Sequence, residues 1–306
     1  MSTEVNAQAS SPFDDPAHAD LVLQSNDNVN FFVYKLLLSL VSPVFKDMFA
    51  MPQPESDVIN INDSSHPVVP VGEDSETLNR ILSWCDPRCS PVLGSVEDIQ
   101  VLLRVADKYC MENVMKRVGE TLAYGLEGMC PMGVGSVRIY AIAIRYRLDD
   151  LAQKAAKCSL ACKLEDHIIG DVPELAHIPA IALHRLQQYR LLCGAAAKKV
   201  ALDWSWIPDA TGVVSECRSC ASGQPPRHWS KWWVQYMALA ADELYRYPSG
   251  YAIVPELAAL PLAHLGSCDE CGRTMGETNQ ALLRFNKALI KEIERVVAGV
   301  PCVVVQ

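Results

Sequence analysis

The stretch Asp20–Phe49, DLVLQSNDNVNFFVYKLLLSLVSPVFKDMF, most constrains the fold, because its pattern changes from strand to helix midway. Leu21–Leu23 and Val29–Val33 are short aliphatic and aromatic runs, and the Ser-Asn-Asp-Asn between them has turn chemistry. From Tyr34 onward the apolar residues follow helical spacing. Ser42-Pro43 ends one helix and starts another, because Ser caps helices and Pro loses no hydrogen bond at the first helical position. The stretch predicts strand, turn, strand, helix and helix.

The rest of the chain predicts a few more strands and then helices. Short strands are expected at Val58–Ile61 and at Pro67–Val71, whose two prolines suit only an edge strand. Apolar periodicity predicts helices at Ser75–Trp84, Val96–Tyr109, Asn113–Leu126, two runs within Pro131–Lys163, Ala180–Leu202, about Ser230–Tyr245 and Glu277–Ala298. The fold class is therefore α+β, a small-sheet domain followed by a mainly α-helical C-terminal region. Residues 1–18 are polar without periodicity and predict a mobile tail.

The opening stretch resembles the start of a BTB/POZ domain, "F-x-V-H-K-x-x-L-x-x-x-S-x-V-F-x-x-M-F". The matching residues are Phe32, Val33, Lys35, Leu38, Ser42, Val44, Phe45, Met48 and Phe49. Tyr34 stands where the family usually has His. Downstream, VEDIQVLLRVADKYCMENV resembles the family's later "L-L-x-x-A-D-K-Y-x-M" helix. The whole arrangement resembles fungal BTB proteins with a long C-terminal extension.

This resemblance implies a domain plan and a function. It implies a BTB/POZ domain at residues 19–126, a helical, BACK-like extension at residues 131–202, and a C-terminal helical segment at residues 203–306. BTB proteins of this kind are non-enzymatic interaction modules that form homo- or heterodimers and act as scaffolds. The residues that the resemblance assigns to the interaction surface are Asp20, Lys35, Leu38, Phe45 and Phe49.

Asp20 and Lys35 leave two readings open. In BTB domains the matching acidic and basic positions are buried near the dimer surface and shape a charged pocket. The alternative is a surface Asp before a strand and a solvated Lys at a helix start, because most charged side chains are exposed unless paired.

Two narrower functions follow from the same family. The first is a substrate adaptor of a cullin-3 ubiquitin ligase. Such adaptors often carry an apolar-x-Glu motif after the second helix. Here the polar Gln53 stands two residues before Glu55, so the motif is not met. The second is a BTB-type transcriptional regulator that acts through partners. A net charge of −9 with no basic cluster argues against direct contact with nucleic acid, which needs Lys and Arg to neutralise phosphates.

Two Cys-x-x-Cys pairs, Cys217/Cys220 and Cys268/Cys271, are the sharpest chemical signal. Two such pairs can supply the four sulfurs of a tetrahedral structural zinc site. The 47 residues between the pairs exceed the usual spacing, but a longer loop adds only about 0.6 kcal/mol per doubling to the cost of closure. Ordinary reduced thiols are the main alternative. Redox chemistry is a weaker one, because neither pair follows a strand and opens a helix.

The remaining features bound the class of protein. Tryptophans gather in the last third and suit either a small metal-stapled core, which we favour, or partner anchors: Trp204, Trp206, Trp229, Trp232 and Trp233. No G-x-S-x-G, P-loop or H-E-x-x-H motif occurs, so no catalysis is expected. No membrane span or secretory signal is visible, and twelve cysteines without a signal indicate a reducing, intracellular location in nucleus or cytoplasm.

Overall fold

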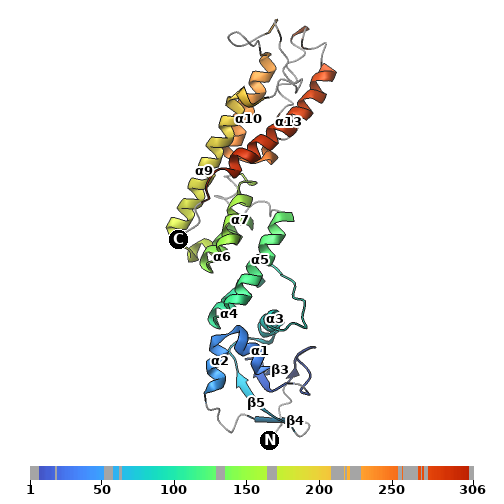
Figure 1. Ribbon diagram of the computed structural model, residues 1–306, viewed down its shortest axis with the longest axis vertical. Helices are drawn as coiled ribbons and strands as arrows, with labels where there is room; N and C mark the ends of the chain where they lie inside the picture. Colours follow the sequence, from blue (N-terminus) through green and yellow to red (C-terminus); the bar gives the residue numbers. More distant parts are fainter. Residues whose placement is uncertain are drawn as a thin grey trace. The chain divides into compact units, whose positions relative to one another are not determined.

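The computed structural model divides into two compact units, Met1–Tyr124 with Tyr146–Leu148, and Gly125–Arg145 with Asp149–Gln306 (Figure 1). The residues that the structure describes are 7–17, 19–51, 58–61, 64–128, 135–163, 171–207, 217, 219–220, 229–253, 257, 268–269, 271 and 275–302. Helices dominate the second unit, whereas the first combines a small sheet with helices, so the α+β class is confirmed.

A mixed five-stranded sheet forms the base of the first unit, in the order β1-β3-β2-β5-β4. The antiparallel pair β2–β3 places Leu21 opposite Val33, and β2 also runs parallel to β5. At the two edges, β1 runs parallel to β3 and β4 runs antiparallel to β5. The strands span β1 (Ala7–Gln8), β2 (Leu21–Gln24), β3 (Val29–Val33), β4 (Val58–Ile61) and β5 (Ser64–Pro70).

Residues 7–17 do not form the mobile tail that the sequence predicts. β1 pairs with the start of β3, and the Phe32 backbone N–H donates a 2.9 Å hydrogen bond to the Phe13 carbonyl. The Phe13 side chain is fully buried and lies beside Phe31, with ring centroids 6.2 Å apart. A single buried aromatic therefore anchors a polar segment whose composition gives no periodic signal.

β5 is not an edge strand, which corrects the expectation drawn from its two prolines. β4 pairs with its first half, from Ser64 to Pro67, whereas β2 pairs with its second half, from Val68 to Pro70. Pro67 and Pro70 each stand at the end of one ladder. A proline at such a position removes no hydrogen bond from the middle of a ladder.

Among the described residues of the first unit, five helices complete the fold. They are α1 (Lys35–Val41), α2 (Pro43–Ala50), α3 (Ser75–Cys85), α4 (Val96–Lys108) and α5 (Glu112–Gly128), the last of which continues into the second unit. Ser42 joins α1 to α2: its hydroxyl accepts from the Phe45 backbone N–H at 3.1 Å and donates to the Tyr109 carbonyl at 2.6 Å. The Phe45 ring stacks on Tyr109 at 4.6 Å, so the α1–α2 hairpin is held against the end of α4.

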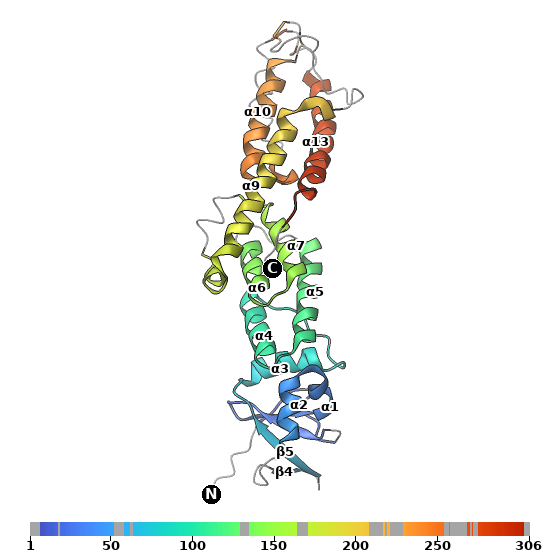
Figure 2. The same ribbon diagram turned by 60° about the vertical axis from the view of Figure 1, so that its left-hand side comes forward.

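The second unit is built from helices alone among its described residues. Its elements are α6 (Gly135–Arg145), α7 (Asp149–Ser159), η1 (Pro173–His177), α9 (Ala180–Leu202), η2 (Trp204–Trp206), α10 (Lys231–Arg246), η4 (Gly250–Ala252) and α13 (Met275–Ala298). The three long helices α9, α10 and α13 lie side by side in Figure 2. Gly194 lets α9 approach α10 closely, because a Cβ there would lie 2.4 Å from the Tyr245 carbonyl oxygen.

A buried arginine ties three helices of this unit together. The Arg190 guanidinium, on α9, donates to the carbonyls of Ser159 and Cys162 at the end of α7 and, at 3.0 Å, to that of Arg246 at the end of α10. Helix C-termini carry unsatisfied carbonyls and partial negative charge, which a buried cation offsets. Among the described residues, no helix is both long and apolar enough to cross a membrane.

Candidate functional site

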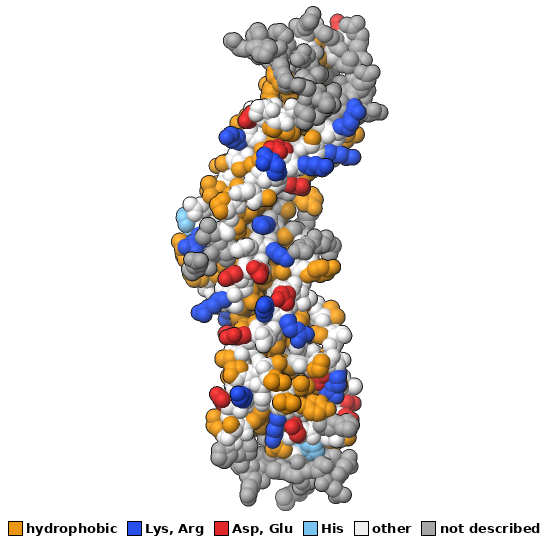
Figure 3. All heavy atoms as spheres, in the orientation of Figure 1, with side chains coloured by type: hydrophobic (Ala, Val, Ile, Leu, Met, Phe, Trp, Pro, Cys, Tyr) orange, Lys and Arg blue, Asp and Glu red, His pale blue; other side chains and the backbone are white. Residues whose placement is uncertain are grey.

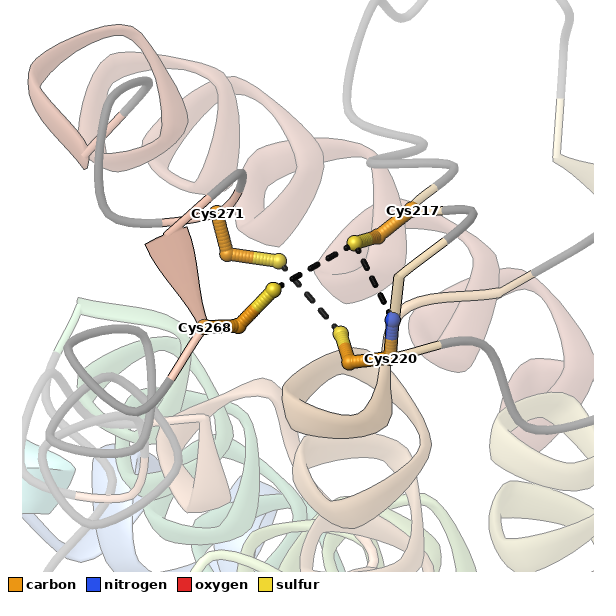
Figure 4. A group of neighbouring side chains, drawn as sticks. All are labelled: Cys217, Cys220, Cys268 and Cys271. Carbon is orange, nitrogen blue, oxygen red and sulfur yellow. Dashed lines mark hydrogen bonds between the residues drawn. The ribbon is translucent and has the colours of Figure 1, made fainter.

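The structure brings the four predicted cysteines together from two distant segments (Figure 4). Cys217 and Cys220 follow η2, and Cys268 and Cys271 precede α13. The Sγ atoms of Cys217 and Cys268 are 3.6 Å apart, and those of Cys220 and Cys271 are 3.5 Å apart. All four sulfurs lie within 4.8 Å of one another.

These distances fit a tetrahedral site. With Zn–S bonds of about 2.3 Å, the edge of an ideal tetrahedron between two sulfurs is about 3.8 Å. The Cys220 backbone N–H also donates to the Cys217 sulfur at 3.4 Å, an interaction that stabilises a thiolate. The four cysteines are therefore clustered at metal-binding distance, in an arrangement compatible with structural zinc.

Burial sets the protonation of these thiols. Cys217 and Cys271 are buried and the other two are partly buried. Loss of hydration raises the pKa of the Cys217 and Cys271 thiols, so without a neighbouring cation they are neutral at pH 7. A bound divalent cation reverses this balance and favours the thiolate.

The cysteine cluster adjoins an aromatic core. Cys217 and Cys271 belong to the same hydrophobic cluster as Trp232 and Trp233, and the other three tryptophans pack against its edge. The fully buried Trp233 ring contacts Phe285 of α13 at a centroid distance of 4.6 Å. The preference for core over partner anchors is thus confirmed for Trp232 and Trp233, and two of the cysteines belong to the same core.

The Asp20 side chain interacts with the backbone of Lys35 and not with its ammonium group. The Asp20 carboxylate accepts a 2.7 Å hydrogen bond from the Lys35 backbone N–H at the start of α1. Asp20 is exposed, Lys35 is half-exposed, and no ion pair joins their side chains in the part of the chain that the structure describes. Within one chain the carboxylate stabilises a helix N-terminus. A charged pocket at a dimer surface stays a prediction.

Leu38 and Phe45 are core residues, which corrects their assignment to the interaction surface. Both side chains are 2% exposed, and Phe49 is half-buried against Phe45, with ring centroids 5.8 Å apart. Leu36 and Leu40, which the family resemblance does not assign to the interaction surface, are 67% and 69% exposed. Their spacing of four places both on one face of α1.

The burial of the Glu73 carboxylate likewise cannot be predicted from the sequence. Glu73 is buried between β5 and α3, and its two oxygens accept from the Lys108 ammonium at 2.5 Å and the Tyr109 hydroxyl at 2.6 Å. The partners stand 35 and 36 residues away along the chain. The cluster links the start of α3 to the end of α4 and has a structural role.

The comparison with protein families bears on the first unit. The family model described as BTB/POZ domain matches residues 10–126. The match begins at residue 10, so it includes the buried Phe13, and it ends at residue 126. A search of curated proteins found no match.

Proposed function

Because this chain carries a BTB/POZ domain at residues 10–126, we propose that it is a non-enzymatic scaffold that pairs with a second BTB chain through the exposed face of α1. BTB domains are in general protein-interaction modules. The observation that carries the proposal is the exposure of Leu36 and Leu40, two large apolar side chains one turn apart on a helix of the domain. Burying a leucine stabilises an association by roughly 1.5–3 kcal/mol.

Light scattering coupled to size exclusion tests this proposal. We expect a dimer at micromolar concentration, and a monomer when Leu36→Glu and Leu40→Glu are combined, because burying two carboxylates opposes association. Val92→Glu is the matched control: Val92 lies in the same unit, is 90% exposed and is distant in sequence from α1, so this variant stays dimeric. A monomeric parent chain refutes the proposal.

The chemistry of the cysteine cluster supports a second part of the proposal, a structural zinc ion held by all four thiolates. Four protein sulfurs fill a tetrahedral coordination sphere and leave no position for a reacting water. The ion would join the segment after η2 to the segment before α13, a structural role that suits a scaffold. Metal analysis of the purified chain is expected to give one zinc per chain, and a chain that holds none refutes this part.

The partner in this proposal is a protein, and direct nucleic-acid binding is not part of it. Figure 3 shows hydrophobic, basic and acidic side chains interspersed on the visible face. The net charge of −9 likewise offers no electrostatic attraction to phosphates.

The narrower roles stay predictions. The loop with Gln53 and Glu55, where an adaptor motif for cullin-3 would stand, lies outside the described residues. Co-purification with cullin-3 would favour the adaptor role, and a regulator acting through partners would instead associate with DNA only through them. The intracellular location stays a prediction, and the structure lends it no support, because Cys158 is disulfide-bonded.

A further inference from the structure

Two sulfur–sulfur contacts of the cysteine cluster run between the segment after η2 and the segment before α13. Cys217 contacts Cys268 at 3.6 Å, and Cys220 contacts Cys271 at 3.5 Å, so the two contacts use every sulfur once (Figure 4). We propose that hydrogen peroxide oxidises the cluster to the disulfides Cys217–Cys268 and Cys220–Cys271. These two bonds would hold the same two segments together after the proposed zinc ion has left.

Each of the two contacts pairs an accessible sulfur with a buried one. Cys220 and Cys268 are partly buried, whereas Cys271 and Cys217 are only 5% and 1% exposed. Cysteines that respond to oxidants are accessible to solvent and lie beside a second cysteine that resolves the oxidised sulfur. Cys220 and Cys268 therefore react with the peroxide, and Cys271 and Cys217 resolve them.

The reaction balances with peroxide as the oxidant. The Cys220 sulfur attacks one peroxide oxygen: an S–O bond forms, the O–O bond breaks, and the hydroxide that leaves takes a proton to become water. The Cys271 sulfur then attacks the Cys220 sulfur: an S–S bond forms, the S–O bond breaks, and the second oxygen leaves as water with another proton. The two sulfurs lose two electrons to one peroxide. Cys268 and Cys217 consume a second peroxide in the same way.

The stability of the folded unit favours pairing between the segments over pairing within each Cys-x-x-Cys. Disulfides within the two motifs would close loops of two residues and leave the segments unlinked once the metal is lost. Pairing between the segments closes the 47 residues between Cys220 and Cys268, and a disulfide restricts the unfolded chain more when its loop is longer. It also keeps Cys217 and Cys271 in the aromatic core that they share. Thiol–disulfide exchange allows the pairing to settle on the more stable form.

Peptide mapping after oxidation tests the pairing in the full-length chain. The chain carries Cys110→Ser, because Cys110 is an exposed free thiol that can cross-link two molecules. After about two equivalents of hydrogen peroxide per chain, remaining thiols are alkylated, the chain is digested without reduction, and the disulfide peptides are measured by mass spectrometry. We expect the Cys217–Cys268 and Cys220–Cys271 peptides to exceed those linked within a motif by roughly tenfold. Cys193, which is fully buried, is the internal control and should stay reduced.

Order of addition tests whether the disulfides replace the metal as the link. A zinc chelator added to the reduced chain is expected to shift the tryptophan emission to the red, because the aromatic core becomes hydrated. The same chelator added after the peroxide should take up the released zinc and leave the emission maximum unchanged. A red shift on adding peroxide alone would overturn the inference.

The outcomes separate this inference from the zinc proposal. Release of zinc by peroxide rests on the proposed metal site, whereas the pairing rests only on the positions of the four sulfurs. A chain that holds no zinc before the peroxide is added refutes the metal site alone, because the peptide map still shows which cysteines pair. Disulfides within the two Cys-x-x-Cys motifs, or four cysteines that stay reduced, overturn the inference and leave the metal site standing.

Discussion

Replacing one cysteine of the cluster, by Cys271→Ser, is expected to abolish binding of the proposed zinc ion and to unfold the second unit. Bringing Cys220 and Cys268 together closes a segment of 47 intervening residues. The chain entropy lost on closing such a loop is about 4 kcal/mol. Structural zinc contributes roughly 10–16 kcal/mol, so its net effect is about 6–12 kcal/mol. A domain is stable by only about 5–15 kcal/mol in total, and this unit therefore has little stability left without the ion.

Tryptophan fluorescence reports unfolding of the second unit with little contribution from the first. Five of the six tryptophans lie in or against the aromatic core beside the cysteines, and only Trp84 belongs to the first unit. We expect Cys271→Ser, or a zinc chelator added to the parent chain, to shift the emission to the red as this core becomes hydrated. Metal analysis of the same samples should show the zinc content falling from one per chain to below one.

Cys110→Ser is the matched control for this experiment. Cys110 is an exposed free thiol outside the cluster, so its replacement should leave both the zinc content and the emission unchanged. If Cys271→Ser keeps a full zinc ion, or if the parent chain contains none and ignores the chelator, the assignment of the cluster as a metal centre is wrong.

Two further predictions concern the first unit. Tyr109→Phe removes the hydroxyl that donates to the buried Glu73 carboxylate and should lower the free energy of unfolding by about 1.5–3 kcal/mol in urea titrations. The control Tyr124→Phe, at an exposed position, should leave the free energy of unfolding unchanged. Equal effects of the two substitutions would contradict the role of the buried hydrogen bond. Hydrogen bonds from Arg88 hold the pKa of Asp86 below its ordinary value of 3.8, so its stabilising effect is complete above the unfolded-state pKa and is lost as the pH falls below about 4. The stability difference between the parent chain and Asp86→Asn should accordingly shrink between pH 5 and pH 2, and a difference that stays constant would rule out this carboxylate as the cause.

The cysteine cluster could be predicted from the sequence because its chemistry depends on residue type more than on exposure. Two Cys-x-x-Cys pairs identify the four candidate sulfur ligands whatever structure the chain between the pairs adopts. The buried position of Glu73 could not be predicted, because its partners, Lys108 and Tyr109, lie on an element far along the chain. The anchoring of residues 7–17 could not be predicted either, since it depends on one phenylalanine in a polar segment.

The proposed interaction face of α1 could not be predicted from the sequence for a different reason, which lies in the caps of the helix. Four of the seven residues of α1 are leucines, so periodicity alone does not show which side faces the core. Hydrogen bonds at both ends fix the rotation of α1 about its axis. The Asp20 carboxylate accepts from the Lys35 backbone N–H, and the Ser42 backbone N–H donates to the Leu38 carbonyl. Leu38, turned inward, lies about 200° around the helix from Leu36, which is therefore turned outward. Asp20 thus helps to orient α1 and the proposed partner surface on it, even though its carboxylate forms no ion pair with the Lys35 side chain in the described part of the chain.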